Sequence, residues 1–582
     1  MIRAGALPAV IASLGHAAVP ARFLGAGSNS TPKFPDQRQI LPPMNWNHTV
    51  PCSILVRPPH DLPRDSSEVP SNPARGATNS PLRARGGTAF ASLAGQMNKF
   101  YVACDLSLES SRVMLGTLNQ DALTISEVRR FATQPVQSKD GLHWDIPWLY
   151  QQVLDGLQAV GGYEEAVDGI SCHSWAGDYL LFQSDGSLIT PSHHYLDPRT
   201  QEGIQKVLSR ISKEALYEET GVQPMPPNAL FQLAAEKSRR LSQAACLLPT
   251  ADAFNFLLSG VARCEESLAG ATQLYNPTTR TWSQRLSKLL GLPSKLLPPL
   301  ISGGTELGPL RADVAKSTSL EDARVVAACS HETAAALLAV PTSPGESWAY
   351  LRLGSSATVG TELAQPIITD TSYNRGFTNA PGYGGSVHFS KQTVGLWILE
   401  ECLRYWKQQD RQIDDTLLTH LAGSAPPFES LINPADPRFL TPGEMPLKIH
   451  AFCRETNQTV PRKPGPIIRC ILESLALFYR RTLQEIEELT GRPITRVYLL
   501  DGAANHLLKH FITNAVRRPL VTLSPDAAAI GNVLVQALAL GHLQSVDRAR
   551  DLVGKSTKAE TLLPHTTAWD TAFMRMAELR AA

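Results

Sequence analysis

Residues 100–116 read FYVACDLSLESSRVMLG, and residues 325–335 read VVAACSHETAA. Both segments are an apolar strand that runs into a short polar turn. Each turn carries one acid, Asp105 in the first and Glu332 in the second, where a metal ion or a proton would be handled. Two such turns in one chain predict the two phosphate-handling edges of one nucleotide cleft, and therefore a kinase built from two similar halves.

Length and charge bound the class of protein. The chain has 582 residues, enough for more than one domain with a buried core. With 54 Lys and Arg against 53 Asp and Glu, electrostatics gives no support for nucleic acid or an anionic membrane as a partner. No apolar run approaches the roughly 20 residues that span a bilayer. The nine cysteines form no CxxC pair, so we expect no zinc site, and reduced thiols in a cytoplasmic protein.

Residues 1–96 differ from everything that follows. They are rich in Pro, Ser, Arg and Ala and lack sustained apolar periodicity, so we expect a disordered extension. Two origins stay open. Residues 1–27 contain arginine and no acid, as a transit peptide would, while a start at Met97 would make the extension spurious.

The rest of the chain alternates strands and helices twice. In the first half we expect strands at 100–105, 112–118, 123–131 and 324–328, a strand pair at 169–172 and 179–183, and helices at 148–160, 200–211, 228–242, 250–258 and 333–339. In the second half we expect strands at 348–353, 357–362 and 496–500, and helices at 393–408, 466–489 and 527–540. The pattern predicts two α/β domains with a cleft between them, at 97–341 and 342–551, followed by a loosely attached tail at 552–582.

Phosphoryl transfer needs donors around the phosphates, a metal held by a carboxylate, and a base aimed at the accepting hydroxyl. Asp105 ends the first strand and is expected to reach a magnesium ion directly or through water. Ser110, Ser111 and Arg112 offer hydroxyl, amide and guanidinium donors to phosphate oxygens. Taken alone, the segment fits an ordinary hairpin with a turn-stabilising aspartate equally well.

Glu332 lies between a buried strand and a helix, so its carboxylate is expected to face the cleft near helix-end amides. A carboxylate there can take a proton from an attacking hydroxyl, and His331 beside it can donate to a sugar oxygen. The alternative is that Glu332 is a plain first-turn helix acid.

A series of motifs runs through residues 98–551. It includes DGLHWD at 140–145, DPRT at 197–200, PNALFQL at 227–233, ATQL at 271–274, GLW at 395–397, INP at 432–434, DPRF at 436–439, PGEM at 442–445, ESLAL at 473–477 and GN at 531–532. With these motifs the chain resembles the FGGY family of carbohydrate kinases, and within it the members that act on L-rhamnulose.

The resemblance implies a ribonuclease-H-like fold, duplicated in two domains that close over ATP, Mg²⁺ and a ketose, in a monomer or homodimer. It places the catalytic base on Glu332, the metal-facing acid on Asp105, and the sugar site on Trp175, Ala176, Asp178 and His331. The first phosphate loop falls on Leu108, Glu109, Ser110, Ser111 and Arg112, and nucleotide contacts from the second domain fall on Ser355, Gln392, Glu400 and Gly502.

The chain departs from the family pattern at the expected chemistry. Relatives have glycine where Ser107, Ser111 and Ala176 stand, and aspartate where Glu332 stands. A Cβ at a turn that needs positive φ would be strained, and a base one methylene longer is displaced. Two further hypotheses therefore stay open: a kinase for another sugar, such as xylulose or fuculose, and a catalytically impaired protein that binds sugar or nucleotide.

Overall fold

The computed structural model describes residues 98–163, 165–500, 505–565 and 568–579. These residues belong to one of the two compact units into which the chain divides, the unit that contains Gln96–Ala582. The expectation of a disordered segment at 1–96 and the proposed nucleotide contact Gly502 lie outside the described residues.

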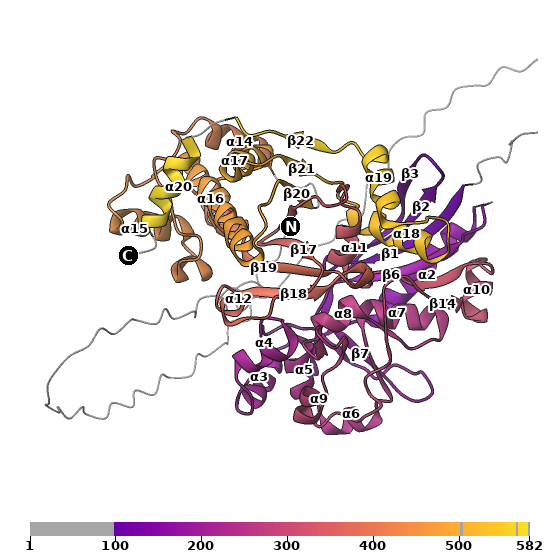
Figure 1. The fold of residues 1–582 in the computed structure, drawn as a ribbon. Helices are drawn as coiled ribbons and strands as arrows, with labels where there is room; N and C mark the ends of the chain where they lie inside the picture. Colours follow the sequence, from indigo (N-terminus) through magenta and orange to yellow (C-terminus); the bar gives the residue numbers. More distant parts are fainter. Residues whose placement is uncertain (1–97, 164, 501–504, 566–567, 580–582) are drawn as a thin grey trace, which may run out of the picture. The chain divides into compact units, whose positions relative to one another are not determined.

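The first half is built on a six-stranded sheet with the order β14-β15-β6-β1-β2-β3 (Figure 1). Its strands are β1 (Lys99–Leu106), β2 (Ser110–Leu118), β3 (Leu123–Ala132), β6 (Gly169–Ser174), β14 (Thr305–Pro309) and β15 (Arg324–Ala327). Strands β1, β2 and β3 form an antiparallel meander, whereas β1, β6 and β15 are parallel. The carboxyl ends of the three parallel strands therefore meet at one edge of the sheet.

The second half repeats this arrangement in a seven-stranded sheet with the order β18-β19-β17-β16-β20-β21-β22. Its strands are β16 (Trp348–Leu353), β17 (Ser356–Leu363), β18 (Phe377–Pro381), β19 (Val387–Val394), β20 (Arg496–Leu500), β21 (Leu520–Thr522) and β22 (Glu560–Leu562). Strand β16 is antiparallel to β17 and parallel to β20, as β1 is to β2 and β6. The predicted duplication is confirmed, and β18 is an addition at one edge.

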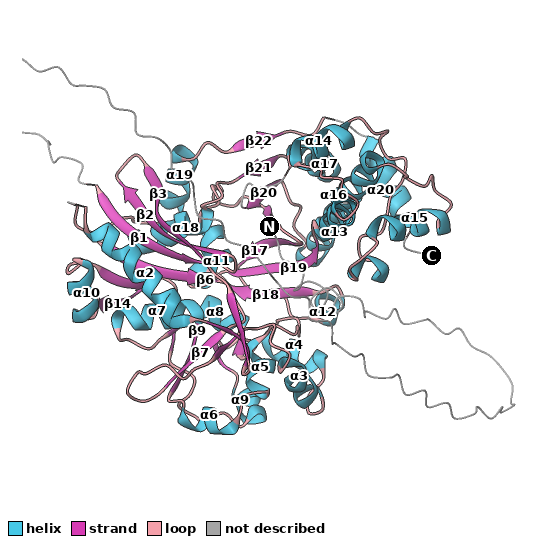
Figure 2. Ribbon diagram, turned by 180° about the vertical axis from the view of Figure 1, so that it is seen from behind, coloured by secondary structure: helices cyan, strands magenta, loops and turns pink. Residues whose placement is uncertain are grey.

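Helices cover both faces of the first sheet (Figure 2). One face packs on α2 (Ile146–Gly161), α7 (Thr250–Ser259) and α10 (Ala312–Thr318) through the face of β1 that contains Val102 and Cys104. The other face contains Tyr101 and Ala103, and packs on α11 (Glu332–Leu338) and α18 (Ala527–Ala539). Alternate residues of one strand thus enter separate cores.

A group of short elements is inserted between β6 and β14. Its helices are α3 (Thr200–Leu208), α4 (Lys213–Thr220), α5 (Ala229–Ala234), α6 (Ser238–Gln243), α8 (Glu266–Ala271) and α9 (Gln284–Leu290). Its strands are β7 (Tyr179–Phe182), β8 (Ser192–His193), β9 (Cys246–Pro249), β10 (Cys264–Glu265), β11 (Tyr275–Asn276), β12 (Thr281–Trp282) and β13 (Leu300–Ile301), and β8 pairs with the hairpin of β4 (Pro135–Ser138) and β5 (Gly141–Trp144).

Two expectations for this insert are wrong. Strand β7 pairs with β9 rather than with β6, because β6 is already paired on both sides by β1 and β15. The single helix expected at 228–242 is divided into α5 and α6. At the break Lys237 is extended, and the buried Glu236 beside it accepts bonds from Tyr179 and Arg240.

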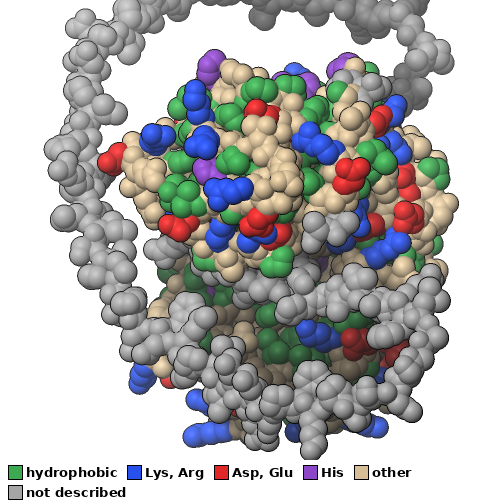
Figure 3. Space-filling view, turned by 90° about the vertical axis from the view of Figure 1, so that its left-hand side faces the viewer, with side chains coloured by type: hydrophobic (Ala, Val, Ile, Leu, Met, Phe, Trp, Pro, Cys, Tyr) green, Lys and Arg blue, Asp and Glu red, His purple; other side chains and the backbone are tan. Residues whose placement is uncertain are grey.

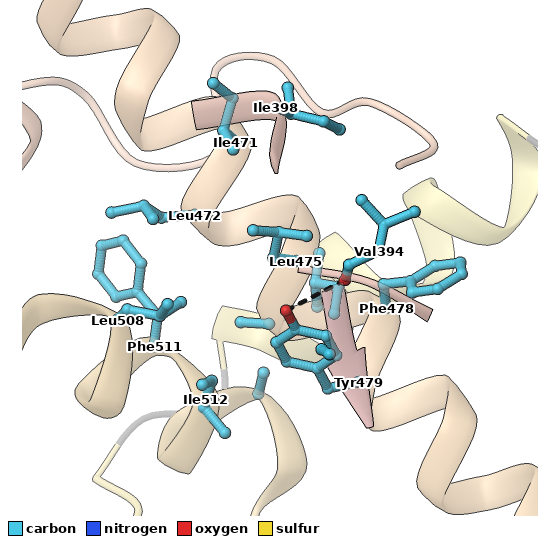
Figure 4. Packing of buried hydrophobic residues seen from close by; sticks show 14 of the residues in the cluster. Val394, Ile398, Ile471, Leu472, Leu475, Phe478, Tyr479, Leu508, Phe511 and Ile512 are labelled. Atoms are coloured by element: carbon cyan, nitrogen blue, oxygen red, sulfur yellow. Dashed lines mark hydrogen bonds between the residues drawn. The ribbon is translucent and has the colours of Figure 1, made fainter. Parts of the chain in front are cut away.

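The second half has a core around one long helix, α16 (Pro464–Thr490). Figure 4 shows its residues Leu475, Phe478 and Tyr479 against the second sheet, where the Tyr479 hydroxyl donates to the Val394 carbonyl at 3.2 Å. The second half also contains α12 (Asp370–Asn374), α13 (Trp397–Lys407), α14 (Asp415–Gly423), η2 (Pro437–Leu440), α15 (Met445–Glu455), α17 (His506–Val516) and α20 (Ala568–Glu578). Two further elements, η1 (Tyr383–Gly385) and α19 (Val546–Ser556), pack instead with the core that contains α11 and α18. Helix α13 begins later than the expected residue 393, because residues 393 and 394 end β19.

The loosely attached tail expected from residue 552 is also wrong. Strand β22 pairs antiparallel with β21 and so belongs to the second sheet. Helix α20 buries Trp569 edge-on against Phe428 and beside Phe511. The segment is attached to the domain because β22 pairs with β21 and the apolar face of α20 packs against the core.

The described surface agrees with the balanced composition. On the face in Figure 3, basic and acidic side chains lie among one another with apolar and other residues between them. Within the described residues, no helix combines the length and the apolar character that crossing a membrane requires.

Candidate active site

The parallel strands β1, β6 and β15 bring the two predicted acids to one edge of the first sheet. Asp105, near the end of β1, is the register partner of His173 on β6. The next β6 residue, Ser174, forms a bridge with His331 and donates from its amide to the Ser330 carbonyl at 2.8 Å. Asp105 and Glu332 therefore lie two strands apart in a shared site, although more than 200 positions separate them in sequence.

The Asp105 carboxylate is buried and surrounded by donors. Oδ2 accepts from Arg112 Nη2 at 2.7 Å and from Arg112 Nε at 3.0 Å, and Oδ1 accepts from Ser107 Oγ at 3.0 Å. His173 Nε2 lies 3.2 Å from Oδ1. Burial alone would raise the pKa of Asp105, but His173 and Arg112 outweigh it and hold the pKa well below its ordinary value.

The phosphate turn between β1 and β2 is shaped by its serines. Ser111 Oγ accepts from the Ser107 amide at 3.1 Å and lies 2.6 Å from the Thr133 hydroxyl. The positive-φ residues of the described chain include neither Ser107 nor Ser111. The strain expected from a Cβ at these two positions is therefore absent, and Leu108 and Glu109 remain exposed at the tip.

Arg112 links this turn to the second half of the chain. Its Nη1 donates to Asp526 Oδ1 at 2.6 Å, and Asp526 precedes the first turn of α18. Three of the five guanidinium N–H groups thus bind carboxylates, and two stay available to a phosphate.

Glu332 is the first residue of α11 and meets a cation from the other half. Arg352 Nη1, on β16, donates to Glu332 Oε1 at 2.6 Å. Burial would raise the pKa of Glu332, but the charge of Arg352 lowers it below its ordinary value. His331 beside it has its pKa lowered to about 4 by burial, so the imidazole is neutral near pH 7.

A pair of buried acids holds the turn that precedes Glu332. Glu265 Oε2 accepts from the Ser330 amide at 2.9 Å, and Asp252 Oδ1 accepts from the Ser330 hydroxyl at 2.6 Å. Burial raises the pKa of Asp252 to about 7 and that of Glu265 to about 8. Sequence analysis missed both acids, since neither stands in a motif that a local pattern would reveal.

The expected sugar residues gather beside this site. Asp178 Oδ2 accepts from the indole nitrogens of Trp144 and Trp175, each at 2.7 Å. Among the protein groups of the described residues, Asp178 Oδ1 has no hydrogen-bond partner. Burial raises the pKa of Asp178 to about 7. Ala176 lies partly exposed between Trp175 and Asp178.

Tyr195 is a residue of this region that sequence analysis missed. Its ring stacks on that of His194 at 4.4 Å between centroids. Burial raises the pKa of the Tyr195 hydroxyl, and the charges of Asp178 and Glu332 add to the effect. Tyr195 therefore lies within electrostatic reach of both Asp178 and Glu332. In the sequence Tyr195 stands two residues before the DPRT motif, and this position is the signal that could have identified it.

The nucleotide residues expected from the second half also come together. Ser355 Oγ donates to the Glu400 carboxylate at 2.7 and 2.9 Å, and Gln392 Nε2 donates to Ser356 Oγ at 3.2 Å. Burial raises the pKa of Glu400, and the charge of Glu109 adds to the rise. The turn between β1 and β2 is thus close to Glu400 of the second half.

Two cavities of about 330 and 340 Å³ lie elsewhere, along α16. The first is lined by Arg480, Glu487 and Arg518 among others, and the second by Leu477 and Phe573 among others. No predicted site residue lines either cavity. The candidate chemistry is located by the strand ends, not by these cavities.

Fold and site together define a phosphotransferase with two similarly built α/β domains. The N-terminal domain of the FGGY family of carbohydrate kinases matches residues 100–339, and its C-terminal domain matches residues 349–540. The chain belongs to the FGGY family of carbohydrate kinases, as the motifs predicted.

Relatives and solved structures agree with this assignment. A rhamnulokinase from Bacteroides thetaiotaomicron is 35% identical over 82% of this chain and 99% of its own length. One from Enterococcus faecalis is 35% identical over 79% of this chain and 93% of its own length. A ligand-bound xylulose kinase from Lactobacillus acidophilus superposes with a TM-score of 0.69 at 16% identity, covering 83% of this chain and 98% of that one. The similarity to the xylulose kinase structure confirms the predicted fold class.

Proposed function

We propose that this protein is an ATP-dependent kinase that phosphorylates L-rhamnulose at its C1 hydroxyl. The observation that carries the proposal is the meeting of Asp105 and Glu332 at one sheet edge, with the nucleotide residues around Ser355 close by. Relatives that are 35% identical along nearly their whole lengths are rhamnulokinases, which favours this sugar over xylulose or fuculose.

In the proposed reaction Glu332 is the general base. Its lowered pKa leaves the carboxylate ionised near pH 7, able to accept a proton. The O–H bond of the sugar breaks as the proton moves to Glu332. A bond then forms from the sugar oxygen to the γ-phosphorus, and the bond from that phosphorus to the β-phosphate oxygen breaks, releasing ADP.

The donors of the phosphate turn would hold the nucleotide's phosphates. Arg112 has N–H groups left for a phosphate oxygen, and Ser110 and the turn amides lie beside it. Leu108 and Glu109 flank the same turn. Ser355, Gln392, Glu400 and Gly502 are proposed contacts from the second domain.

The described residues fit a magnesium ion that arrives with the nucleotide. The two oxygens of Asp105 already receive three hydrogen bonds and the His173 contact, which leaves little room for direct coordination. No group of three His, Cys, Asp or Glu among the described residues is placed to hold a metal. Mg²⁺ bound by the phosphates, and approached by Asp105 through water, would supply charge neutralisation.

Asp178 is the proposed anchor for the sugar. Its Oδ1 is buried and, among the described residues, accepts no hydrogen bond of normal length, although the Tyr195 backbone lies near the carboxyl group; a sugar hydroxyl would complete its hydrogen bonding. Trp175 fixes that carboxylate from one side, and Ala176 forms the adjacent wall. The neutral His331 and the Tyr195 hydroxyl are further proposed sugar contacts.

The proposal is tested by coupling ADP release to a visible signal with rhamnulose, xylulose, fuculose and glycerol in turn. We expect the highest kcat/KM with rhamnulose. Glu332→Gln keeps the shape of the base and is expected to lower kcat by about 10²–10⁴-fold. Thermal stabilisation by a sugar without any ADP release would instead identify a binding protein.

We place the protein in the cytoplasm as a monomer or homodimer. The eight cysteines of the described residues are all free thiols, which supports a reducing compartment. Separation by size with light scattering tests the assembly state.

A further inference from the structure

Among the described residues, Arg352 is the side chain of the second half that bonds to Glu332. Its Nη1 donates to Glu332 Oε1 at 2.6 Å and lies 3.3 Å from the Thr333 hydroxyl. The Glu332 side chain is 17% exposed and that of Arg352 is 37% exposed. The pair therefore lies at the boundary of the buried region, where solvent and solutes still reach the guanidinium.

The direction of Arg352 follows from the strand that carries it. Trp348 and Tyr350 point to the core shared with α11 and α18, whereas Ala349 and Leu351 point to the core around α16. Because side chains alternate along a strand, Arg352 continues the first set, toward α11. Ser355 follows three positions later in the sequence, after the end of β16.

The contact constrains a side chain that would otherwise be free to rotate. A glutamate at the start of a helix has three side-chain torsions, and a base must lie within hydrogen-bond reach of the proton it takes. Arg352 holds Oε1. Among the described residues no hydrogen bond reaches Oε2, so this oxygen is left to face an incoming hydroxyl.

We propose that Arg352 is a positioning residue for the base: it anchors Glu332 by one carboxylate oxygen and thereby fixes the direction of the other. The inference rests on the proposed function. Other charged or titratable groups that face Glu332 are Asp105 on β1, His331 on its own turn and Tyr195 after β8. The charges of His173 and His388 act on His331 rather than directly on Glu332.

These neighbours set the sign of the effect. Burial and the charge of Asp105 both raise the pKa of Glu332, and Arg352 is the main opposing group. Without Arg352 the pKa of Glu332 rises, so less of the base is ionised at a given pH. The acidic limb of the kcat/KM profile should then move to higher pH.

The test compares Arg352→Ser and Arg352→Lys with the parent protein on the best sugar. We expect Arg352→Ser to lower kcat by about 10–100-fold, with both KM values changed less than about threefold, because misplacement by about 1 Å costs up to 10²-fold in rate. The acidic limb of its kcat/KM profile should move to higher pH. Arg352→Lys should return this limb to the position of the parent protein but restore only part of kcat. Arg375→Ser is the matched control, since Arg375 makes a surface ion pair with Glu488 at 2.6 Å.

Two outcomes overturn the inference: an acidic limb that stays in place in Arg352→Ser, or the same loss in Arg375→Ser. Failure of the proposed function has a different signature, since the parent protein would then release no ADP with any sugar. A second readout, the pH dependence of the unfolding midpoint, requires no turnover. The effects of Arg352→Ser and Glu332→Gln on it should be non-additive, and additivity would also refute the pairing.

Discussion

At Asp105 a single carboxylate collects donors from separate parts of the chain. Ser107 and Arg112 approach from the phosphate turn, and His173 from β6. His173 Nδ1 lies 3.1 Å from the amide nitrogen of Asn532 on α18, which directs the other ring nitrogen toward Asp105. One acid is thus linked both to the turn between β1 and β2 and, through His173, to α18, the helix that follows β21.

The first prediction concerns the stability that Asp105 supplies. Asp105→Asn leaves Arg112 facing an uncharged amide in a buried place, and removing one partner of a buried pair costs about 3–5 kcal/mol. We expect a loss in this range in urea unfolding at pH 7, and none for the exposed Asp322→Asn. The pKa of Asp105 is depressed in the folded state, so its contribution is present above the ordinary aspartate pKa. The difference between the two proteins should shrink as pH falls below about 4.

Asp252 gives the opposite pH dependence. Burial raises its pKa to about 7, so the folded protein retains a proton that the unfolded chain loses at lower pH. Stability from this group is full below about pH 4 and is lost as pH rises toward 7. Asp252→Asn should therefore flatten the stability profile between these values. Urea midpoints measured across that range would contradict this if the variant kept the parent's slope.

Among the elements, the crossing of α11 and α18 joins the two halves most closely. Gly531 on α18 passes so near α11 that a Cβ built on it would lie 1.7 Å from the Ala335 carbonyl oxygen. Glycine is required at this position because the two helices approach so closely. Helix propensity alone would favour alanine. Helix α18 belongs to the second half in sequence, yet it covers the first sheet.

Gly531→Ala should part these helices. Overpacking of this kind costs about 1–3 kcal/mol, and the displacement would also move Asp526 and its bond to Arg112. We expect a lower unfolding midpoint together with a lower kcat. Gly423→Ala on α14 is the control, because nothing lies within 4 Å of its built Cβ and alanine gains up to about 1 kcal/mol in a helix. Equal behaviour of the two variants would show that the crossing is not tight.

In the whole molecule, the two kinase domains have separate sheets of similar topology but share one hydrophobic core. Tyr101 and Met114 of the first sheet pack in the same cluster as Trp348, Tyr498 and Ile530 from the second half. Removal of the second half would expose this face of the first sheet to water.

We therefore expect that residues 97–341 do not fold alone, whereas 97–582 unfolds in a single cooperative transition. Circular dichroism on heating and limited proteolysis would measure both. A cooperative melt of the shorter chain would show that the shared cluster is dispensable, and two separated transitions in the longer chain would show that the domains unfold independently.

The class of fold, the duplication and the two acid-bearing turns could be predicted from the sequence, because strand periodicity and the motifs are local properties of the chain. Ser355, Gln392 and Glu400 came from the family resemblance alone, and their role at the nucleotide stays a prediction. The surroundings of these groups could not be predicted, because they depend on how distant segments pack. Asp252 and Glu265 beneath the base, Tyr195 beside it, and the attachment of the final helix all depend on contacts between distant segments. The Arg352–Glu332 pair is of the same kind, since parallel strand pairing and the return of α18 bring together residues that no local pattern relates.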